Sequence, residues 1–153
     1  MRHMAPFRFA VQAYAAGSRA QWREMAQSAE GDGFSAFHLA DHVIGEGPAL
    51  AATNHPLQTL AAVPAMCFAA EATSTIKVGC RVMCVDYRHP AVMAKEAATI
   101  DLLTEGRLEL GLGAGWLQGE YEALGMTMDP APVRIARLAE VVSATRALWS
   151  GEQ

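Results

Sequence analysis

Residues 76–113 decide the fold, and they read IKVGCRVMCVDYRHPAVMAKEAATIDLLTEGRLELGLG. The segment Ile76–Val85 is rich in branched apolar residues and predicts a strand. Pro90 suits the first turn of a helix, and Gly106 ends that helix just before a second strand-like segment, Arg107–Gly113. A strand, a helix and a strand in this order predict two parallel strands joined by a right-handed crossover.

The same alternation continues toward the N-terminus. Phe7–Tyr14 and Phe34–Ala40 are rich in apolar and aromatic residues and predict two earlier strands. A helix between them begins at Ser18, and Gln21 follows at the spacing of a capping box, in which each side chain bonds the other residue's backbone N–H. These segments predict a first β-α-β unit.

The remaining segments complete a β-α-β-α-β-α-β-α order. Val43–His55 predicts a long loop, which is the least structured part of the chain. The helix after it ends near Thr73, and either it kinks at Pro64 or its regular part starts there. A short helical stretch after the fourth strand and a last helix over Val133–Trp149 complete the pattern. The alternation predicts an α/β fold, which is either a doubly wound sheet or a barrel.

Composition narrows the function classes. The chain has 153 residues and a formal net charge of −4. Its charges are interspersed, without the basic stripe of a nucleic-acid binder, and no apolar run approaches the about 20 residues of a membrane span. Residues 1–6 are not followed by the apolar segment of a secretion signal. The three cysteines form no CxxC motif, so we expect reduced thiols in a cytoplasmic protein and no metal site.

Polar residues at the end of the second strand form the first candidate site. In α/β folds, function collects where strands end and helices begin. Asp41 and His42 follow the second strand, where a carboxylate beside an imidazole could orient a cofactor and move a proton. Taken alone, this pair is interpreted as a loop aspartate bonded to backbone amides and an exposed histidine.

The end of the third strand offers further candidates. Cys80 and Cys84 are an even number of residues apart, so we interpret them as small core residues on one strand face. Arg81 needs an anionic partner or a route to water, so it either pairs with a carboxylate at the sheet's mouth or binds a ligand. Arg88 is interpreted as an exposed loop arginine, with contact to a cofactor phosphate as the alternative, and His89 as shaping the next helix.

The end of the fourth strand, residues 111–116, reads GLGAGW. Glycines at every second position let a backbone approach a flat ligand without Cβ clashes. The run is not the dinucleotide fingerprint GxGxxG, because Trp116 stands where the last glycine belongs.

Taken together, these segments resemble the luciferase-like monooxygenase family from Phe7 to Trp149. The matching stretches are Ala40-Asp41-His42, residues 75–79 (TIKVG), residues 87–90 (YRHP), residues 95–101 (KEAATID), Gly106-Arg107, residues 110–116 (LGLGAGW), Glu120-Tyr121, Gly125 and residues 134–149. Several matches in the right order are more specific than any one of them.

The resemblance implies a TIM (β/α)8 barrel with a cofactor lying across its carboxyl-terminal face. It favours the deazaflavin coenzyme F420, with FMN as the alternative. Asp41 and His42 would be the catalytic residues, with His42 facing the reacting centre and Asp41 bonding the cofactor ring. A non-proline cis peptide at Arg81-Val82 would support that ring. The implied cofactor-binding residues are Asp41, Cys80, Arg81, Val82, Ala114, Gly115 and Trp116.

Two features depart from the family. Trp116 stands where the deazaflavin-dependent sugar-phosphate dehydrogenases carry an acidic catalytic residue, which disfavours that substrate class. In length, residues 1–153 correspond to the N-terminal half of the barrel, with only its first four β/α units. A half barrel has free strand edges and, by our expectation, an exposed apolar inner face. We therefore expect a homo-oligomer or pairing with a missing C-terminal half.

The sequence thus predicts an oxidoreductase that transfers hydride between F420 and a small-molecule organic substrate. If the cofactor is FMN, the reaction would be oxygen insertion by a monooxygenase. The alternative from another class is a truncated, non-catalytic binding or assembly module.

Overall fold

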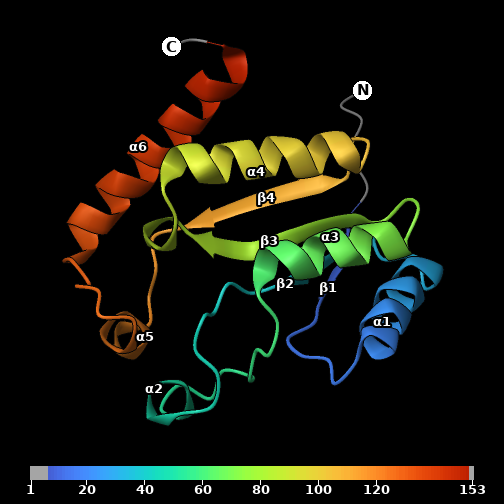
Figure 1. Ribbon diagram of the computed structural model, residues 1–153, viewed down its shortest axis with the longest axis horizontal. Helices are drawn as coiled ribbons and strands as arrows, with labels where there is room; N and C mark the ends of the chain where they lie inside the picture. Colours follow the sequence, from blue (N-terminus) through green and yellow to red (C-terminus); the bar gives the residue numbers. More distant parts are fainter. Residues whose placement is uncertain (1–6, 152–153) are drawn as a thin grey trace.

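The computed structural model describes residues 7–151 and shows one parallel sheet (Figure 1). The sheet has four strands in the order β1-β2-β3-β4, and every neighbouring pair is parallel. The strands are β1 (Ala10–Gln12), β2 (Ala36–Leu39), β3 (Lys77–Cys84) and β4 (Leu108–Gly113). The predicted sequential order is confirmed, and it excludes the doubly wound alternative, in which the strand order reverses.

The helices form a layer on one face of this sheet. They are α1 (Arg19–Gly31), α2 (Pro48–Ala51), α3 (Ala62–Ala72), α4 (Pro90–Leu103), α5 (Gln118–Ala123) and α6 (Ala131–Ser150), with a 3-10 turn at Val85–Tyr87. Helices α1, α3 and α4 cover the sheet, α6 leans against α4, and α2 and α5 lie together beyond the strands' carboxyl ends (Figure 1). Within residues 7–151, no helix is both long and apolar enough to cross a membrane.

The hydrophobic core lies between the sheet and these helices. Phe37 of β2 packs against Trp22 of α1 with ring centroids 5.0 Å apart, and the Trp22 indole N–H donates to the Ala65 carbonyl of α3 at 3.0 Å. The leucines of β4, from Leu108 to Leu112, also pack against this core. At about 25 cal/mol per Å² of apolar surface, burial in this layer is the main force that holds helices and sheet together.

The opposite face of the sheet corrects one expectation. We expected this inner face to be apolar, but alternation along the strands places polar residues and glycines there. The His38 ring of β2 lies 3.1 Å from the Glu109 carboxylate of β4 across this face, and Arg8 forms an ion pair with the same carboxylate. The large apolar residues of β2 and β4 point into the helix layer instead, and Val82 in β3 is the large apolar side chain that stays exposed over β2–β4.

Several element boundaries also differ from the predictions. Strand β1 is shorter than Phe7–Tyr14, because it pairs on one side only and its neighbour β2 is itself short. The loop Val43–His55 contains the helix α2, whose first residue is a proline. Pro64 lies in the first turn of α3, so the helix starts there and does not kink.

The capping box of α1 is formed only in part. The Ser18 hydroxyl accepts from the Gln21 N–H at 3.2 Å, as predicted. The Gln21 side-chain oxygen accepts from the Gly17 N–H at 2.7 Å. In a complete capping box it would accept from the Ser18 N–H, one residue later.

Glu30, near the end of α1, caps the start of β3. One oxygen of its carboxylate accepts the backbone N–H groups of Ser74, Thr75 and Ile76 at 2.9, 2.6 and 3.0 Å. Burial raises the pKa of Glu30, but these hydrogen bonds outweigh it and lower the pKa from 4.5 to about 2. The ionised carboxylate therefore stabilises the folded chain.

The sign of this linkage gives a first prediction. A carboxyl whose pKa is depressed on folding contributes stability above its unfolded pKa of 4.5, and that contribution is lost as the pH falls toward 2. Glu30→Gln should lower the free energy of unfolding at pH 7 and flatten its pH dependence between these two values. Urea denaturation at several pH values measures both effects. Glu24→Gln, an exposed change on the same helix, is the control, and an equal effect there would contradict the assignment.

Candidate active site

A cavity of about 130 Å³ opens where β2, β3 and β4 end. The loops after these strands and the helix α5 supply its walls. Six of the predicted site residues line it, namely Asp41, His42, Arg81, Val82, Gly115 and Trp116. The predicted convergence of these residues on one mouth of the sheet is therefore confirmed.

Two predicted residues do not line the cavity. The Cys80 side chain is buried in the core on the helix side of the sheet, where burial raises the pKa of its thiol. Ala114 lies beside the cavity, and its carbonyl accepts a hydrogen bond from Arg134 at 3.0 Å. The structure therefore contradicts cofactor contact by the Cys80 side chain, and it gives Ala114 a bond to α6.

A bulge in β3 explains the position of Cys80. The register with β4 shifts between Cys80 and Met83, and the Arg81-Val82 peptide is cis, at the predicted place. An extra residue reverses the alternation, so that Met83 points into the core and Cys84 toward the cavity. The prediction that both cysteines share one face is therefore wrong. Arg81 in the bulge is exposed and reaches water.

The glycines of β4 make room for this bulge. A Cβ on Gly111 would lie 2.6 Å from the Cys80 carbonyl oxygen, and one on Gly113 would overlap Val82 Cγ2. Gly115 has a φ of +74°, and a Cβ there would overlap the Tyr121 hydroxyl. We expected the glycines to admit a flat ligand, but the space beside Gly111 and Gly113 is taken by Val82. The Val82 side chain then forms part of the cavity wall.

Asp41 joins the ends of β2 and β3. Both of its oxygens bond the Arg88 guanidinium, with the Oδ1 contact at 2.8 Å, and Oδ2 also accepts the Cys84 N–H at 2.9 Å. The hydrogen bonds that Arg88 donates to Asp41 raise the pKa of Arg88. Arg88 is thus not an exposed loop arginine, and its guanidinium is directed at Asp41 and not at a phosphate. Contact between Asp41 and a cofactor ring stays a prediction.

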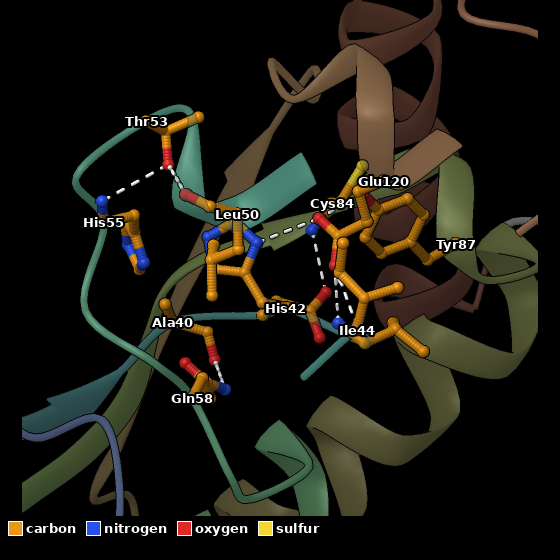
Figure 2. Close-up of polar contacts among 12 residues, drawn as sticks. Ala40, His42, Ile44, Leu50, Thr53, His55, Gln58, Cys84, Tyr87 and Glu120 are labelled. Carbon is orange, nitrogen blue, oxygen red and sulfur yellow. Dashed lines mark hydrogen bonds and ion pairs between the residues drawn. The ribbon is translucent and has the colours of Figure 1, made fainter. Parts of the chain in front are cut away.

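His42 is held by the buried carboxylate of Glu120, a residue that the sequence analysis quoted only within a matching stretch and gave no role. Its Nδ1 lies 2.8 Å from Glu120 Oε2, and Figure 2 shows Glu120 between His42 and Tyr87. Glu120 also accepts from the Val43 N–H, the Ile44 N–H and the Tyr87 hydroxyl. Burial raises the pKa of Glu120, but these bonds outweigh it, so the pKa lies below its usual value.

His55 is a second residue that sequence reasoning missed. Its ring lies 4.4 Å from the His42 ring and 6.1 Å from the Trp116 ring, measured between centroids. Tyr14 contacts the far side of His55 at 5.3 Å. His55 ends the long loop that contains α2, where no periodic pattern fixes its position. The only sequence signal was a histidine next to a proline.

Val82 and Gly113 supply a second prediction. Gly113→Ala should lower the free energy of unfolding by about 1–3 kcal/mol, because Val82 is β-branched and cannot turn away. Adding Val82→Ala should recover part of that loss, and a double-mutant cycle of denaturation curves measures the coupling. Gly45→Ala is the control, since nothing lies near a Cβ there. Strict additivity of Gly113→Ala and Val82→Ala would show that the two residues do not compete for space.

The Asp41–Arg88 pair supplies a third prediction. Asp41→Ala leaves a partly buried guanidinium and the Cys84 N–H without their acceptor, so it should lower the free energy of unfolding by about 2–4 kcal/mol. Asp32→Ala, an exposed change at the end of α1, should alter it far less. Thermal and urea unfolding of both variants make the comparison. A loss at Asp41 no larger than at Asp32 would mean that the pair adds no stability.

Comparison with known proteins places this geometry in a family. The profile of the luciferase-like monooxygenases matches residues 1–153. The F420-dependent glucose-6-phosphate dehydrogenase of Amycolatopsis mediterranei is 33% identical over 130 residues, 84% of this chain and 37% of that protein. The FMNH2-dependent dimethylsulfone monooxygenase of Pseudomonas fluorescens is 37% identical over 79 residues, 52% of this chain and 21% of that protein. The chain thus spans little more than a third of the first relative's length.

Solved structures agree with the sequence comparison. An F420-dependent secondary alcohol dehydrogenase, solved in complex with an F420-acetone adduct, superposes with a TM-score of 0.76 and 26% identity. The match covers 93% of this chain and 42% of that one. The four β/α units therefore correspond to part of the (β/α)8 barrel of these relatives, which are flavin- or F420-dependent enzymes. The chain belongs to the luciferase-like monooxygenase family.

Proposed function

We propose that the protein is an oxidoreductase that transfers hydride between coenzyme F420 and a small organic substrate. One observation carries the proposal: His42, Val82 and Trp116 face a single cavity at the carboxyl ends of adjacent strands. In barrels of this type, that end of the sheet is where catalytic residues gather.

The cavity wall suits a planar ring with apolar faces and polar edges. Val82 is 43% exposed and Trp116 is 55% exposed, so both present apolar surface that a ring could cover. His42 and Arg81 stand at the margins of that surface and could meet the polar edges. Val82, Gly115 and Trp116 would hold the ring, and the exposed Arg81 could meet an anionic group. When bound, the deazaflavin would supply or accept the hydride.

The protein's own contribution is to position the substrate and to move a proton. Hydride transfer between an alcohol and a carbonyl compound requires a proton to leave or reach the oxygen atom. His42 is suited to this, because histidine titrates near neutral pH and its Nε2 has no hydrogen-bond partner within residues 7–151. Trp116 replaces the acidic residue of the sugar-phosphate dehydrogenases, so we propose a less polar substrate than a sugar phosphate.

The choice of F420 over FMN rests on how much of the chain each relative matches. The F420-dependent relative from Amycolatopsis aligns with 84% of the chain, whereas the FMNH2-dependent relative from Pseudomonas aligns with 52%. The latter match is the observation that favours a second candidate function, an FMN-dependent monooxygenase. Oxygen insertion would use the same cavity.

Binding measurements distinguish the two cofactors. We expect the protein to bind F420 at least about tenfold more tightly than FMN, which corresponds to about 1.4 kcal/mol, in a fluorescence titration. The reverse preference would support the monooxygenase, and no binding of either would contradict both proposals.

His42 is tested separately from binding. His42→Ala should lower turnover by about 10²–10⁴-fold while the dissociation constant of F420 changes much less, because general acid–base catalysis acts on the chemical step. Turnover can be followed by the F420 absorbance with a panel of secondary alcohols and ketones. Unchanged turnover on an accepted substrate would remove His42 from proton transfer.

A further inference from the structure

We infer that Glu120 fixes His42 as its Nδ1–H tautomer, so that Nε2 is the ring nitrogen that takes up and releases a proton at the cavity. The tautomer follows from the geometry of the buried side chains. Its use in proton transfer rests on the proposed function. Glu120 is in this view a positioning residue, because it acts on the reaction only through His42.

The hydrogen bonds around Glu120 determine where the protons lie. The carboxylate is 1% exposed, so water does not compete for it. Oε1 receives the backbone N–H groups of Val43 at 2.6 Å and Ile44 at 3.2 Å, which can only donate. Oε2 receives the Tyr87 hydroxyl at 2.8 Å. An acceptor that already takes three donors is stabilised in its ionised form, and an ionised carboxylate can only accept.

The same logic assigns the proton on His42. Its Nδ1 lies 2.8 Å from Oε2 of this carboxylate, so Nδ1 must be the donor and carry a hydrogen. This holds for the neutral ring and for the imidazolium, since both can donate from Nδ1. Only Nε2 differs between the two states. In the neutral ring Nε2 is a free acceptor, and in the imidazolium it is a donor.

The position of Nε2 allows this nitrogen to exchange a proton with a substrate in the cavity. His42 lines the cavity, and its Nε2 has no hydrogen-bond partner within the part of the chain that the structure describes. The ring is turned toward His55, with centroids 4.4 Å apart (Figure 2). Its centroid also lies 5.9 Å from that of the Trp116 ring. His55 does not set the tautomer, because no hydrogen bond joins the two imidazoles within residues 7–151, and the His55 Nδ1 lies 2.8 Å from the Pro56 carbonyl oxygen instead. The neutral ring is therefore ready to accept a proton from a substrate hydroxyl.

The experiment reads the tautomer directly and needs neither cofactor nor substrate. Nitrogen NMR of the protein labelled with ¹⁵N-histidine separates a protonated Nδ1 from a protonated Nε2. A His42→Gln variant identifies the His42 signals among those of the five histidines. We expect neutral His42 to have a protonated Nδ1 and an unprotonated Nε2. Neutral His42 with its proton on Nε2 would overturn the inference.

Glu120→Gln tests the cause. A glutamine keeps the volume, and its carbonyl oxygen can still accept from Val43 and Ile44, but its NH2 group now points a donor at His42. The His42 proton should therefore move from Nδ1 to Nε2. Glu122→Gln lies on the same short helix but is exposed and bonded to Gln118, so it should leave the tautomer unchanged. A Glu120→Gln protein that keeps the Nδ1 proton would contradict the inference.

Kinetics connect the tautomer to the proposed reaction. On any substrate that the protein accepts, Glu120→Gln should lower kcat at least about tenfold, with the F420 dissociation constant within about twofold of the parent. A fall in F420 affinity as large as the fall in kcat would point to a collapsed site instead of a wrong tautomer. If Glu120→Gln does not fold, the NMR spectrum of the parent still decides the assignment. If the protein turns out not to use F420, the proposed function fails while the tautomer result stands.

Discussion

The buried carboxylate of Glu120 is the interaction on which the rest of the site depends. It joins the loop after β2, through Val43 and Ile44, to the turn after β3, through Tyr87, and to α5, on which Glu120 itself lies. Loss of the carboxylate would take the shared acceptor away from all of these donors, and each donor left buried and unsatisfied costs about 1–3 kcal/mol. The three loops that form the cavity are therefore held as one unit, and His42 takes its orientation from that unit.

The glycines at positions 111, 113 and 115 also fix the shape of the site. Gly111 and Gly113 lack a Cβ where Val82 enters, and Gly115 lacks one where the Tyr121 hydroxyl sits. That hydroxyl donates to Asp86 at 2.7 Å, and Arg137 of α6 donates to the same carboxylate at 2.8 Å. Close packing of backbone and side chain, with no ligand involved, thus requires the glycine run. The packing of Val82 and Tyr121 against these glycines therefore shapes the cavity wall.

Sequence reasoning predicted the fold and where the candidate site lies, but it did not predict the hydrogen bonds within the site. The fold could be predicted because strand–helix alternation is a local signal. The location of the candidate site could be predicted because Asp41, His42 and Trp116 lie directly at strand ends. The bond between His42 and Glu120 joins residues 78 positions apart, and no periodic pattern reports such a pairing. The face of Cys80 and Cys84 was misjudged for a related reason, because a one-residue bulge between them reverses the alternation.

The contacts at the mouth of the sheet also narrow which groups can exchange protons. Two carboxylates line the cavity, and both already accept hydrogen bonds. Asp41 accepts from Arg88 and the Cys84 N–H, and Glu120 accepts from its four donors. Burial raises the pKa of Tyr87 well above its usual value, and burial also raises the pKa of the Cys84 thiol. Among the side chains that line the cavity within residues 7–151, this leaves the imidazoles of His42 and His55 as the candidates for proton exchange. Under the proposed function, proton exchange at this wall belongs to an imidazole, and the Glu120 carboxylate acts by holding the His42 ring in place.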